Sequence, residues 1–248
     1  MSGCNGAMGK MITDLVAKDE EAQIVAGIDI ADDGRNYYPI FSSILDCDVE
    51  ADALIDFSTT KILDDLLSYC EEKGLPAVLC TTGYDEDQLE KIEGAAEKIA
   101  VLKAANMSLG VNTLLHLIQK AAKVFAPEGF DIEIVEKHHN QKLDAPSGTA
   151  LALADSVNEA MDGQYEYIYD RSQRREKRGK KELGISSVRG GTIVGEHDVI
   201  FAGEDEVITF SHTAYSKAVF AKGAVAAAKF LKGKKNGRFD MADVIAAK

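Results

Sequence analysis

The chain opens with the stretch Gly3-Cys4-Asn5-Gly6-Ala7-Met8-Gly9, which leads directly into an amphipathic helical pattern over Met11–Lys18. A short apolar run, Ile24–Ile28, follows and ends at Asp29. Glycines at this spacing let backbone N–H groups approach a pyrophosphate, and the positive end of the helix dipole favours the anion. An acidic residue about twenty positions further on is placed to bind the ribose hydroxyls of a dinucleotide. The stretch therefore predicts a dinucleotide-binding loop, with ordinary turn glycines as the alternative for the loop taken alone.

The residues in front of this loop are too few to form the strand that a loop of this kind follows. Only Met1 and Ser2 precede Gly3. In a dinucleotide-binding βαβ unit the glycine loop joins the first strand to the first helix. The sequence leaves open whether that strand lies upstream of Met1, as it would if the start had been assigned at an internal methionine.

The first half of the chain alternates apolar runs with helical patterns. Three further runs have the character of short buried strands, and the two stretches between them that of helices: Ala53–Ser58, Pro76–Thr81 and Ile99–Ala104, separated by Ile62–Lys73 and Glu86–Lys98. Strands that alternate with helices predict βαβ units and a parallel sheet covered on both faces. Small or polar residues follow each strand, so the carboxyl edge of this sheet is the expected ligand-binding edge.

From about Asp131 the pattern changes. Asp131–Glu136 alternates polar and apolar residues with the period of a half-buried strand. Later segments are also short and β-like, with turn signals between them: Glu182–Arg189, Gly191–Val194, Asp198–Ala202 and Glu206–Ser211. They predict a mixed or antiparallel sheet in a second domain, after which a helix over Ser216–Leu231 and a short tail pack back on the first domain. We therefore expect an α/β protein with a Rossmann-like dinucleotide-binding domain, residues 1–107 plus 218–248, and a mixed α+β domain, residues 108–217.

Composition excludes several classes of protein. The net charge of −13 over 248 residues argues against sequence-independent nucleic-acid binding, which needs a basic face. No apolar stretch approaches the roughly 18–20 residues of a membrane-spanning helix, and no leader opens the chain, so we expect a cytoplasmic protein. The four cysteines, Cys4, Cys47, Cys70 and Cys80, form no C-x-x-C or Cys/His cluster, which predicts buried free thiols, no disulfide and no metal site.

One segment runs against the acidic balance. Arg171–Lys181 holds seven basic residues without the aromatic residues or basic surroundings of a nucleic-acid-binding patch. We interpret it as a solvated, mobile loop, with guidance of an anionic ligand as a further role.

The most chemically specific stretch is His138-His139-Asn140-Gln141-Lys142-Leu143-Asp144-Ala145-Pro146-Ser147-Gly148-Thr149, which leaves a strand and enters a helix over Thr149–Met161. Two histidines and a lysine within five residues make a cationic pocket with groups that titrate near neutrality. Ser147, Gly148 and Thr149 stand at the helix start, where free N–H groups and hydroxyls accept a carboxylate. The alternatives are a plain surface pair of histidines and a metal site, which would need a third ligand at useful spacing.

This stretch resembles the signature H-H-x-x-K-x-D-A-P-S-G-T-A of the 4-hydroxy-tetrahydrodipicolinate reductase family, also called dihydrodipicolinate reductase, of lysine and diaminopimelate biosynthesis. Segments along nearly the whole chain resemble the family as well: Ile55–Ser58, Thr81–Gly83, Ala104–Ser108, Ser187–Gly191, Gly195–His197 and Phe220–Ala224. The resemblance implies NAD(P)H-dependent reduction of 4-hydroxy-tetrahydrodipicolinate to tetrahydrodipicolinate with loss of water. It also implies that the second domain binds this cyclic imine dicarboxylate and assembles the protein into a homotetramer.

The resemblance assigns roles to individual residues. Catalysis falls to His138 as the acid/base group and to Lys142 as a proton donor. The substrate's carboxylates would be held by His139, Ser147, Gly148, Thr149 and Lys217. The cofactor would be bound by Gly3, Cys4, Asn5, Gly6, Ala7 and Met8 at the pyrophosphate, by Asp29 at the adenosine ribose, and by Cys80, Thr81, Thr82, Ala104, Ala105, Asn106 and Met107 on the nicotinamide side.

Three positions depart from the family pattern. Cys80 stands where Gly is common. Lys217 stands where a substrate-binding Arg is common, which keeps the charge but loses the bidentate geometry. Ile30 follows Asp29 where NADP-binding members carry Arg, so a 2′-phosphate lacks an obvious partner unless Arg35 swings in. We therefore expect NADH to be preferred over NADPH.

Two other functions stay open at this point. A related NAD(P)-dependent dehydrogenase of a small amino or dicarboxylic acid would keep the glycine loop without needing the histidine–lysine motif. A non-catalytic dinucleotide sensor would also carry a nucleic-acid or partner surface, whereas the basic residues here are confined to one loop.

Overall fold

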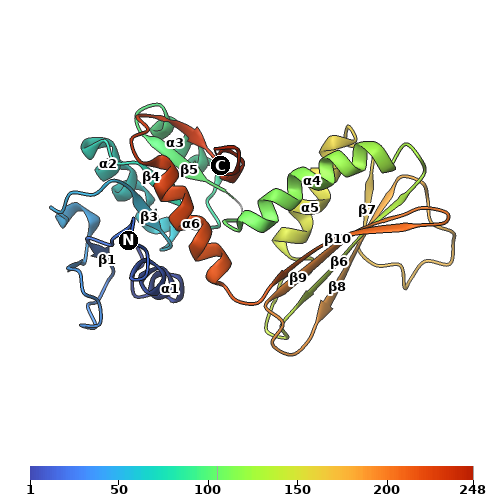
Figure 1. Cartoon of the computed structure of the whole chain (residues 1–248), viewed down its shortest axis with the longest axis horizontal. Coiled ribbons are helices and arrows are strands. Elements are labelled where there is room, and N and C mark those ends of the chain that lie inside the picture. Colours follow the sequence, from blue (N-terminus) through green and yellow to red (C-terminus); the bar gives the residue numbers. More distant parts are fainter. Residues whose placement is uncertain (105, 248) are drawn as a thin grey trace. The chain divides into compact units, whose positions relative to one another are not determined.

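The computed structural model describes residues 1–104 and 106–247, and the chain divides into two compact units. Unit 1 comprises Met1–Leu109 and Ala218–Lys248, and unit 2 comprises Gly110–Lys217. Both units combine a β-sheet with helices (Figure 1). The protein therefore belongs to the predicted α/β class.

Unit 1 is built on a parallel sheet. Its strands are β1 (Gly27–Ile28), β2 (Ile40–Phe41), β3 (Leu54–Asp56), β4 (Ala77–Leu79), β5 (Ala100–Lys103) and β11 (Gly237–Phe239). β2 pairs with β1, and β3, β4, β5 and β11 pair in that order, all in parallel. Ser2 bridges both Ile28 and Asp56 in parallel, so the start of the chain joins the two parts of the sheet. The order β2–β1–Ser2–β3–β4–β5–β11 confirms the Rossmann-like arrangement expected from the sequence.

Helices cover both faces of this sheet because alternate strand residues point to opposite sides. Ala77 and Leu79 pack with α2 (Leu63–Lys73) and α3 (Glu86–Ala96), whereas Val78 packs with α1 (Ala7–Val16) and α6 (Ala218–Leu231). The short helix α7 (Met241–Ala246) adds Met241 and Val244 to the second layer. Two 3-10 turns, η1 (Ile44–Asp46) and η2 (Thr60–Ile62), complete the unit. Strands buried on both faces explain the continuous apolar runs of the sequence.

Met1 and Ser2 lie where a strand is expected in front of the glycine loop. Ser2 donates its N–H to the carbonyl oxygen of Ile55 at 2.8 Å, and Ile28 donates to the carbonyl oxygen of Met1 at 2.9 Å. Phe57 in turn donates to the carbonyl oxygen of Ser2 at 3.1 Å. Met1 and Ser2 therefore form hydrogen bonds with β1 on one side and with β3 on the other, as the last two residues of a strand between them would.

Unit 2 is a mixed five-stranded sheet in the order β10–β9–β6–β8–β7. The strands are β6 (Asp131–His138), β7 (Glu166–Ile168), β8 (Glu182–Arg189), β9 (Gly195–Ala202) and β10 (Val207–Ala214). β6 pairs in parallel with β8 and antiparallel with β9. The helices α4 (Leu109–Phe125), which begins at the last residue of unit 1, and α5 (Gly148–Ala160) pack on one face of this sheet (Figure 1). The mixed sheet predicted from the alternating segments is confirmed, with β8 at the predicted bounds.

One expectation for unit 2 is wrong, and another is incomplete. Gly191–Val194 lies in the turn between β8 and β9 and is not a strand, because the adjacent glycines Gly190 and Gly191 favour a turn. The basic segment Arg171–Lys181 is anchored by ion pairs and is not simply solvated. Arg178 donates to Asp131 at 2.6 Å and to Glu133 at 2.9 Å, and Arg171 and Arg174 pair with Glu182. Acidic residues at the start of β6 and β8 thus bind the loop that the sequence pattern presents as free.

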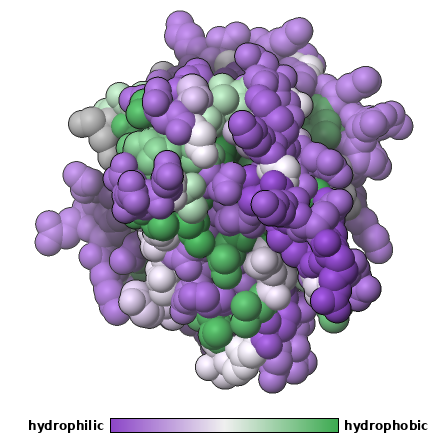
Figure 2. Space-filling view, turned by 90° about the vertical axis from the view of Figure 1, so that its right-hand side faces the viewer, coloured by the Kyte–Doolittle hydropathy of each residue, from purple (hydrophilic) through white to green (hydrophobic). Residues whose placement is uncertain are grey.

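One face of the molecule agrees with the polar composition. The view in Figure 2 is mostly hydrophilic, with hydrophobic side chains gathered in a band near its middle. Within residues 1–104 and 106–247, no helix is both long and apolar enough to cross a membrane.

Candidate active site

The carboxyl end of β6 carries the predicted histidine motif. The alternation of this strand buries Ile132, Ile134, Glu136 and His138, and the two isoleucines pack with α4 and α5. The chain then turns through residues 139–147 and enters α5 at Gly148. The motif is therefore a strand–turn–helix unit with a buried carboxylate two positions before its first histidine.

Glu136 is the centre of a hydrogen-bond network. Its fully buried carboxylate accepts two bonds from the Arg189 guanidinium, at 2.7 Å to Oε1 and 2.8 Å to Oε2. The backbone N–H of Ser147 donates to Oε1 at 3.1 Å, and Nδ1 of His138 lies 2.5 Å from Oε2. Burial by itself would raise the pKa of Glu136, but the bonds from Arg189, Ser187, His138 and Ser147 lower it to about 2. Glu136 is therefore a carboxylate at neutral pH.

This carboxylate fixes the tautomer of His138. An acceptor at Nδ1 requires a proton there, so Nε2 is the nitrogen that can gain or lose a proton. Nε2 faces Gly195, where an added Cβ would lie 3.1 Å away. Burial lowers the pKa of His138, although Glu136 opposes the shift. The positive charge that the sequence assigned to a histidine–lysine pocket therefore lies on Lys142 more than on His138.

A second buried histidine supports the first. The ring of His197, on β9, packs edge-on against His138 with 5.1 Å between the ring centroids. Its Nε2 lies 3.0 Å from Oγ of Ser147, the N-cap residue of α5, and this oxygen also accepts the N–H of Ala150 at 3.1 Å. Burial lowers the pKa of His197 to about 4, and the nearby His138 adds to the shift. The hydroxyl of Ser147 is thus engaged inside unit 2 with a neutral imidazole and with its own helix.

The other residues of the motif lie nearer the surface. Lys142 is partly exposed and forms an ion pair with the exposed Asp144, 2.8 Å from Nζ to Oδ1. Its charge is close enough to lower the pKa of His138 and of His197. His139 is half-buried, and its Nδ1 has no hydrogen-bond partner among the residues described.

The predicted carboxylate-binding residues lie at two places in unit 2. Gly148 is exposed and Thr149 half-exposed at the first positions of α5. Lys217 is exposed three residues beyond β10. The structure therefore brings the start of α5 together with His138, through the bond from Ser147 to Glu136, whereas no described contact links Lys217 to this network.

No role for Glu136, Arg189 or His197 follows from the sequence pattern. One signal for Glu136 was available, because the period-two pattern that buries Ile132 and Ile134 also buries residue 136, and a buried carboxylate needs a partner. The partner itself could not be identified, since Arg189 is 53 positions away in the chain. His197 comes from β9, which pairs with β6 so that Glu136 lies opposite His197.

In unit 1 the glycine loop has the geometry of an anion-binding turn. Gly3 adopts φ +73°, and a Cβ at this position would lie 2.3 Å from the carbonyl oxygen of Phe57. A Cβ at Gly9 would lie 2.3 Å from the carbonyl oxygen of Gly3. α1 begins at Ala7 behind Gly6, with no acidic residue in its first turn and no described side chain capping its N–H groups. The predicted residues Gly3, Cys4, Asn5, Gly6, Ala7 and Met8 form this turn and helix start.

Asp29 at the end of β1 is tied to the same turn. Its Oδ2 accepts the backbone N–H of Asn5 at 2.8 Å, and its Oδ1 accepts the N–H of Ile30 at 2.9 Å. The side chain of Asn5 also accepts from Asn36 at 2.9 Å. The acid and the glycine loop, 24 positions apart, are therefore held together as the sequence predicted. Arg35 forms an ion pair with Asp33 in the next loop.

The carboxyl ends of β3 and β4 meet beside this turn. Asp56 is buried and accepts the hydroxyls of Ser58 at 2.5 Å and Thr81 at 2.6 Å. Cys80 is buried, and burial raises the pKa of its thiol well above the usual value. Thr82 is exposed, Ala104 and Asn106 are half-buried and Met107 is buried. Ala105, also predicted to bind cofactor, lies outside the described residues.

These features of unit 1 fit a dinucleotide. The close backbone approaches at Gly3 and Gly9 keep the turn tight against the sheet and against α1, and the N–H groups at the start of α1 lie where the helix dipole favours a pyrophosphate. Asp29 supplies the carboxylate that a ribose requires. Within residues 1–104 and 106–247, no group of three or more His, Cys, Asp or Glu side chains is arranged to hold a metal ion.

Models of known protein families match the sequences of both units. The family model described as "Dihydrodipicolinate reductase, N-terminus" matches residues 1–107, and "Dihydrodipicolinate reductase, C-terminus" matches residues 110–245. Two relatives named 4-hydroxy-tetrahydrodipicolinate reductase are each 49% identical to the chain. The one from Caldanaerobacter subterraneus covers 98% of this chain and 96% of its own length, and the one from Clostridium novyi covers 100% and 98%.

A solved structure agrees as well. Dipicolinate-bound dihydrodipicolinate reductase from Paenisporosarcina sp. TG-14 superposes with a TM-score of 0.82 at 25% identity, over 98% of this chain and 97% of that one. A probable dehydrogenase from Thermotoga maritima shares the fold, with a TM-score of 0.62 at 10% identity over 99% of this chain and 92% of its own. With both family models matched and relatives 49% identical over nearly their full length, the chain belongs to the dihydrodipicolinate reductase family.

Proposed function

We propose that this chain reduces 4-hydroxy-tetrahydrodipicolinate to tetrahydrodipicolinate with loss of water, using His138 as the acid/base group. One observation carries the assignment to His138. Its Nδ1 is bound by a carboxylate that is itself locked by Arg189 and by the first turn leading into α5. A histidine held in this way presents one nitrogen, Nε2, for proton transfer in a fixed direction.

The substrate carries two carboxylates, and the surroundings of His138 suit an anion. The N–H groups at the start of α5, at Gly148 and Thr149, point out of a helix whose first turn has no acidic residue. His139 and Lys217 add donors by family likeness. The bound dicarboxylate in the similar Paenisporosarcina enzyme, dipicolinate, supports a site of this chemistry.

Ser147 has a different role in this proposal from the one that family likeness alone suggests. Its hydroxyl is already shared between His197 and the N–H of Ala150. We propose that Ser147 holds the first turn of α5 against Glu136, and that its contribution to the substrate comes through this placement of Gly148 and Thr149.

Proton supply is divided between two groups. His138 is mainly neutral near pH 7 because burial lowers its pKa, so its protonated form gives up the Nε2 proton more readily than an ordinary histidine does. Lys142 carries the fixed positive charge of the motif. A dicarboxylate competes with Asp144 for this ammonium group, which places a proton donor beside the ring that receives electron density.

Unit 1 supplies the dinucleotide site. When bound, NAD(P)H supplies the hydride. The turn Gly3–Met8 holds the pyrophosphate, Asp29 holds the adenosine ribose, and Cys80–Thr82 with Ala104–Met107 line the nicotinamide side. NADH is the proposed preferred nucleotide, because Asp29 repels a 2′-phosphate, the neighbouring Ile30 is exposed and uncharged, and Arg35 is paired with Asp33.

The proposal includes a homotetramer built through unit 2, in the cytoplasm. The face of the sheet opposite α4 and α5 carries apolar side chains beside its ion pairs: Val188 is 46% exposed and Val207 is 62% exposed. An assembly that covers this face would bury them. The four cysteines are free and buried, which suits a reducing compartment. Light scattering of the purified protein tests the assembly.

A coupled assay tests the reaction. Substrate generated enzymatically in the cuvette is offered with NADH and then with NADPH, and nucleotide oxidation is followed. Titration with NADH in the presence and absence of pyridine-2,6-dicarboxylate accompanies it. A reductase binds both ligands at once, whereas a dinucleotide sensor ignores the dicarboxylate, and a dehydrogenase of another small acid consumes no nucleotide with this substrate.

A further inference from the structure

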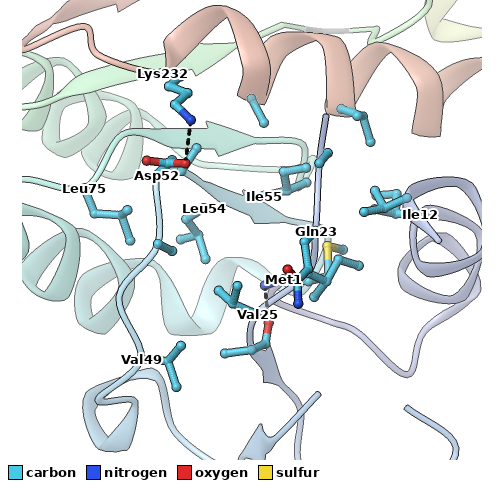
Figure 3. A pocket seen from close by; sticks show the side chains of 18 of the residues that line it. Met1, Ile12, Gln23, Val25, Val49, Asp52, Leu54, Ile55, Leu75 and Lys232 are labelled. Carbon is cyan, nitrogen blue, oxygen red and sulfur yellow. Dashed lines mark hydrogen bonds and ion pairs between the residues drawn. The ribbon is translucent and has the colours of Figure 1, made fainter. Parts of the chain in front are cut away.

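Open space lies beside the strands of both units. In unit 1 a cavity of about 800 Å³ lies around Met1, at the amino ends of β1 and β3 (Figure 3). This is the sheet edge opposite the glycine loop, so the cavity belongs to the framework of the domain and lies away from the expected ligand-binding edge. A smaller space in unit 2 lies beside Nε2 of His138, where Gly195 has no side chain. It is the smaller space that bears on the chemistry.

Gly195 is the residue opposite His138 in the sheet of unit 2. β6 and β9 pair antiparallel, and the last described pair of their ladder is Lys137 with Glu196. One step further along an antiparallel ladder, His138 at the end of β6 lies against Gly195 at the start of β9. On its other side Gly195 pairs with the buried Ala214 of β10. The proposed acid/base residue therefore has two small residues beside it in this row of the sheet.

The backbone does not require glycine at this position. Gly195 lies in a β-strand, and its φ is outside the left-handed region that favours glycine, unlike that of Gly191 at φ +52°. Glycine inside a strand usually weakens it, because the residue loses more backbone entropy on folding and offers no side chain to pack. What distinguishes position 195 is therefore the space that a side chain would otherwise take.

An added side chain at this position would meet the imidazole of His138. An ideal Cβ on Gly195 lies 3.1 Å from Nε2 and 3.4 Å from Cδ2 of His138, and 3.9 Å from Cε1 of His197. It would therefore enter the wedge between the two rings, whose centroids are 5.1 Å apart. Unbonded heavy atoms pack best at about 3.5–4.0 Å, so one of the rings would have to move.

Both rings are held in place. Nδ1 of His138 lies 2.5 Å from Oε2 of Glu136, and this carboxylate is fixed by two bonds from Arg189. Nε2 of His197 lies 3.0 Å from Oγ of Ser147, the N-cap residue of α5. Moving His138 would stretch the bond that sets its tautomer, and moving His197 would disturb the cap. The imidazole of His138 therefore fits its place because the residue opposite lacks a Cβ atom.

We propose that Gly195 is a positioning residue of the reductase reaction, which acts through His138. By leaving room for the imidazole, it lets Glu136 hold Nδ1 while Nε2 stays in the direction of proton transfer. This inference rests on the role of His138 in the proposed function and adds a steric requirement to it. Even the single methyl group of alanine at position 195 should displace the ring, because the packed surroundings cannot take up the extra volume.

Four variants test the proposal beside the wild type: Gly195→Ala, His138→Ala, the double variant of these two, and Gly190→Ala. Gly190 lies in the turn between β8 and β9, its φ is also outside the left-handed region, and a Cβ there would have no described atom within 4 Å. It therefore controls for the addition of a methyl group. Steady-state kinetics and thermal unfolding are measured for every chain. The NMR signal of the Nδ1 proton is followed in the chains that keep His138.

Kinetics and NMR should show the displacement of the ring. Gly195→Ala should lower kcat about tenfold or more, since a small misplacement of a reacting group is costly. The Michaelis constant should change little, because Gly148 and Thr149 stay at the start of α5. The signal of the Nδ1 proton, which is shared with Glu136, should shift or weaken. Gly190→Ala should match the wild type in all three measurements.

Thermal unfolding should change in opposite directions in the two backgrounds. In the wild type the methyl group is forced against His138, so Gly195→Ala should lower the Tm by about 2–4 °C. In the His138→Ala chain the ring is absent, and the same substitution should raise the Tm, because alanine is favoured over glycine inside a strand. A glycine with a purely structural role would give a change of the same sign in both backgrounds.

Several results would overturn the proposal. They are wild-type turnover and an unshifted Nδ1 signal in Gly195→Ala, or equal changes of the Tm in the two backgrounds. If His138→Ala itself keeps normal turnover, the proposed function fails. The NMR signal and the Tm values, which need no substrate, still decide in that case whether Gly195 places the ring.

Discussion

Each unit has a helix that begins where the sheet ends, but the first N–H groups of the two helices are capped differently. α1 begins behind Gly6, with no described side chain on its free N–H groups, whereas α5 begins behind Ser147, whose hydroxyl caps Ala150. In unit 1 the groups proposed to hold the pyrophosphate are backbone N–H groups at a glycine turn. In unit 2 the groups proposed for proton transfer are side chains, and the histidine among them is held by a buried charge network. The turn in unit 1 requires residues that have no Cβ atom. The network in unit 2 requires side chains from strands that are distant in the sequence.

The largest expected effect tests the side-chain design directly. His138→Ala should lower kcat by about 10²-fold or more, the usual scale for losing a positioned acid or base. Steady-state kinetics with generated substrate measure it. His116→Ala, at an exposed position of α4, is the matched control and should keep full activity. Normal turnover by a well-folded His138 variant would remove this residue from the mechanism.

Glu136→Gln tests the network that holds the histidine. It leaves Arg189 without its charge partner, and breaking such a buried pair costs about 3–5 kcal/mol of unfolding free energy. Its turnover should also fall, because the amide no longer requires a proton on Nδ1 of His138. Denaturant unfolding and the pH–rate profile are the measurements. Glu133→Gln, on the same strand but bound to Arg178, should change stability without changing that profile.

The same carboxylate predicts a pH dependence of stability. Its pKa is lowered from 4.5 to about 2 in the folded protein. The stabilisation is therefore complete above about pH 4.5 and is lost as the pH falls toward 2, because the unfolded chain takes up the proton first. The wild type should lose stability over this range more steeply than Glu136→Gln. Parallel curves would mean that Glu136 is not held as a carboxylate.

A comparison of two hydroxyls at the start of α5 should separate binding from positioning. Thr149→Val removes a hydroxyl proposed to face the substrate, and a hydrogen bond to a charged group is worth about 1.5–3 kcal/mol. The Michaelis constant for substrate should rise accordingly, with little change in unfolding temperature. Ser147→Ala should instead cost about 0.5–2 kcal/mol of stability through the lost cap. If Thr149→Val leaves the affinity for pyridine-2,6-dicarboxylate unchanged, this hydroxyl does not bind a carboxylate.

The smallest expected effect concerns the backbone design of unit 1. NADH should have the lower Michaelis constant at low salt, and a preference of about 1.4 kcal/mol would be tenfold. Asp29→Ala should narrow this gap by relieving the repulsion of a 2′-phosphate, whereas Asp32→Ala, in the next loop, should not. Arg35→Ala adds a check. Tighter binding of NADPH by the wild type, lost in Arg35→Ala, would show that Arg35 leaves Asp33 for the phosphate and that the argument from Ile30 is wrong.

The glycine turn of unit 1 could be predicted from the sequence better than the charge network of unit 2. Glycine spacing, apolar runs and Asp29 are local signals, and they were enough for the parallel sheet and the turn at Gly3–Met8. Helix α4 went unpredicted, although it has 17 residues and buries Val111, Leu114 and Ile118 at helical spacing, so its sequence does carry the signal of an amphipathic helix. The partners of Glu136 depend on strand pairing, as Arg189 and His197 reach it only through β8 and β9. Pairing between distant strands leaves no periodic trace in a single sequence.

The distribution of the four cysteines offers an experimental handle on folding. Cys4, Cys47, Cys70 and Cys80 all belong to unit 1, and all are buried. Burial raises the pKa of Cys70 to about 12, so little thiolate exists while the unit is closed. A thiol-reactive dye should therefore modify the native protein at the rate at which unit 1 opens. Far-ultraviolet circular dichroism recorded in parallel would follow the unfolding of both units. Comparing its rate with the rate of dye modification would separate the opening of unit 1 from that of unit 2.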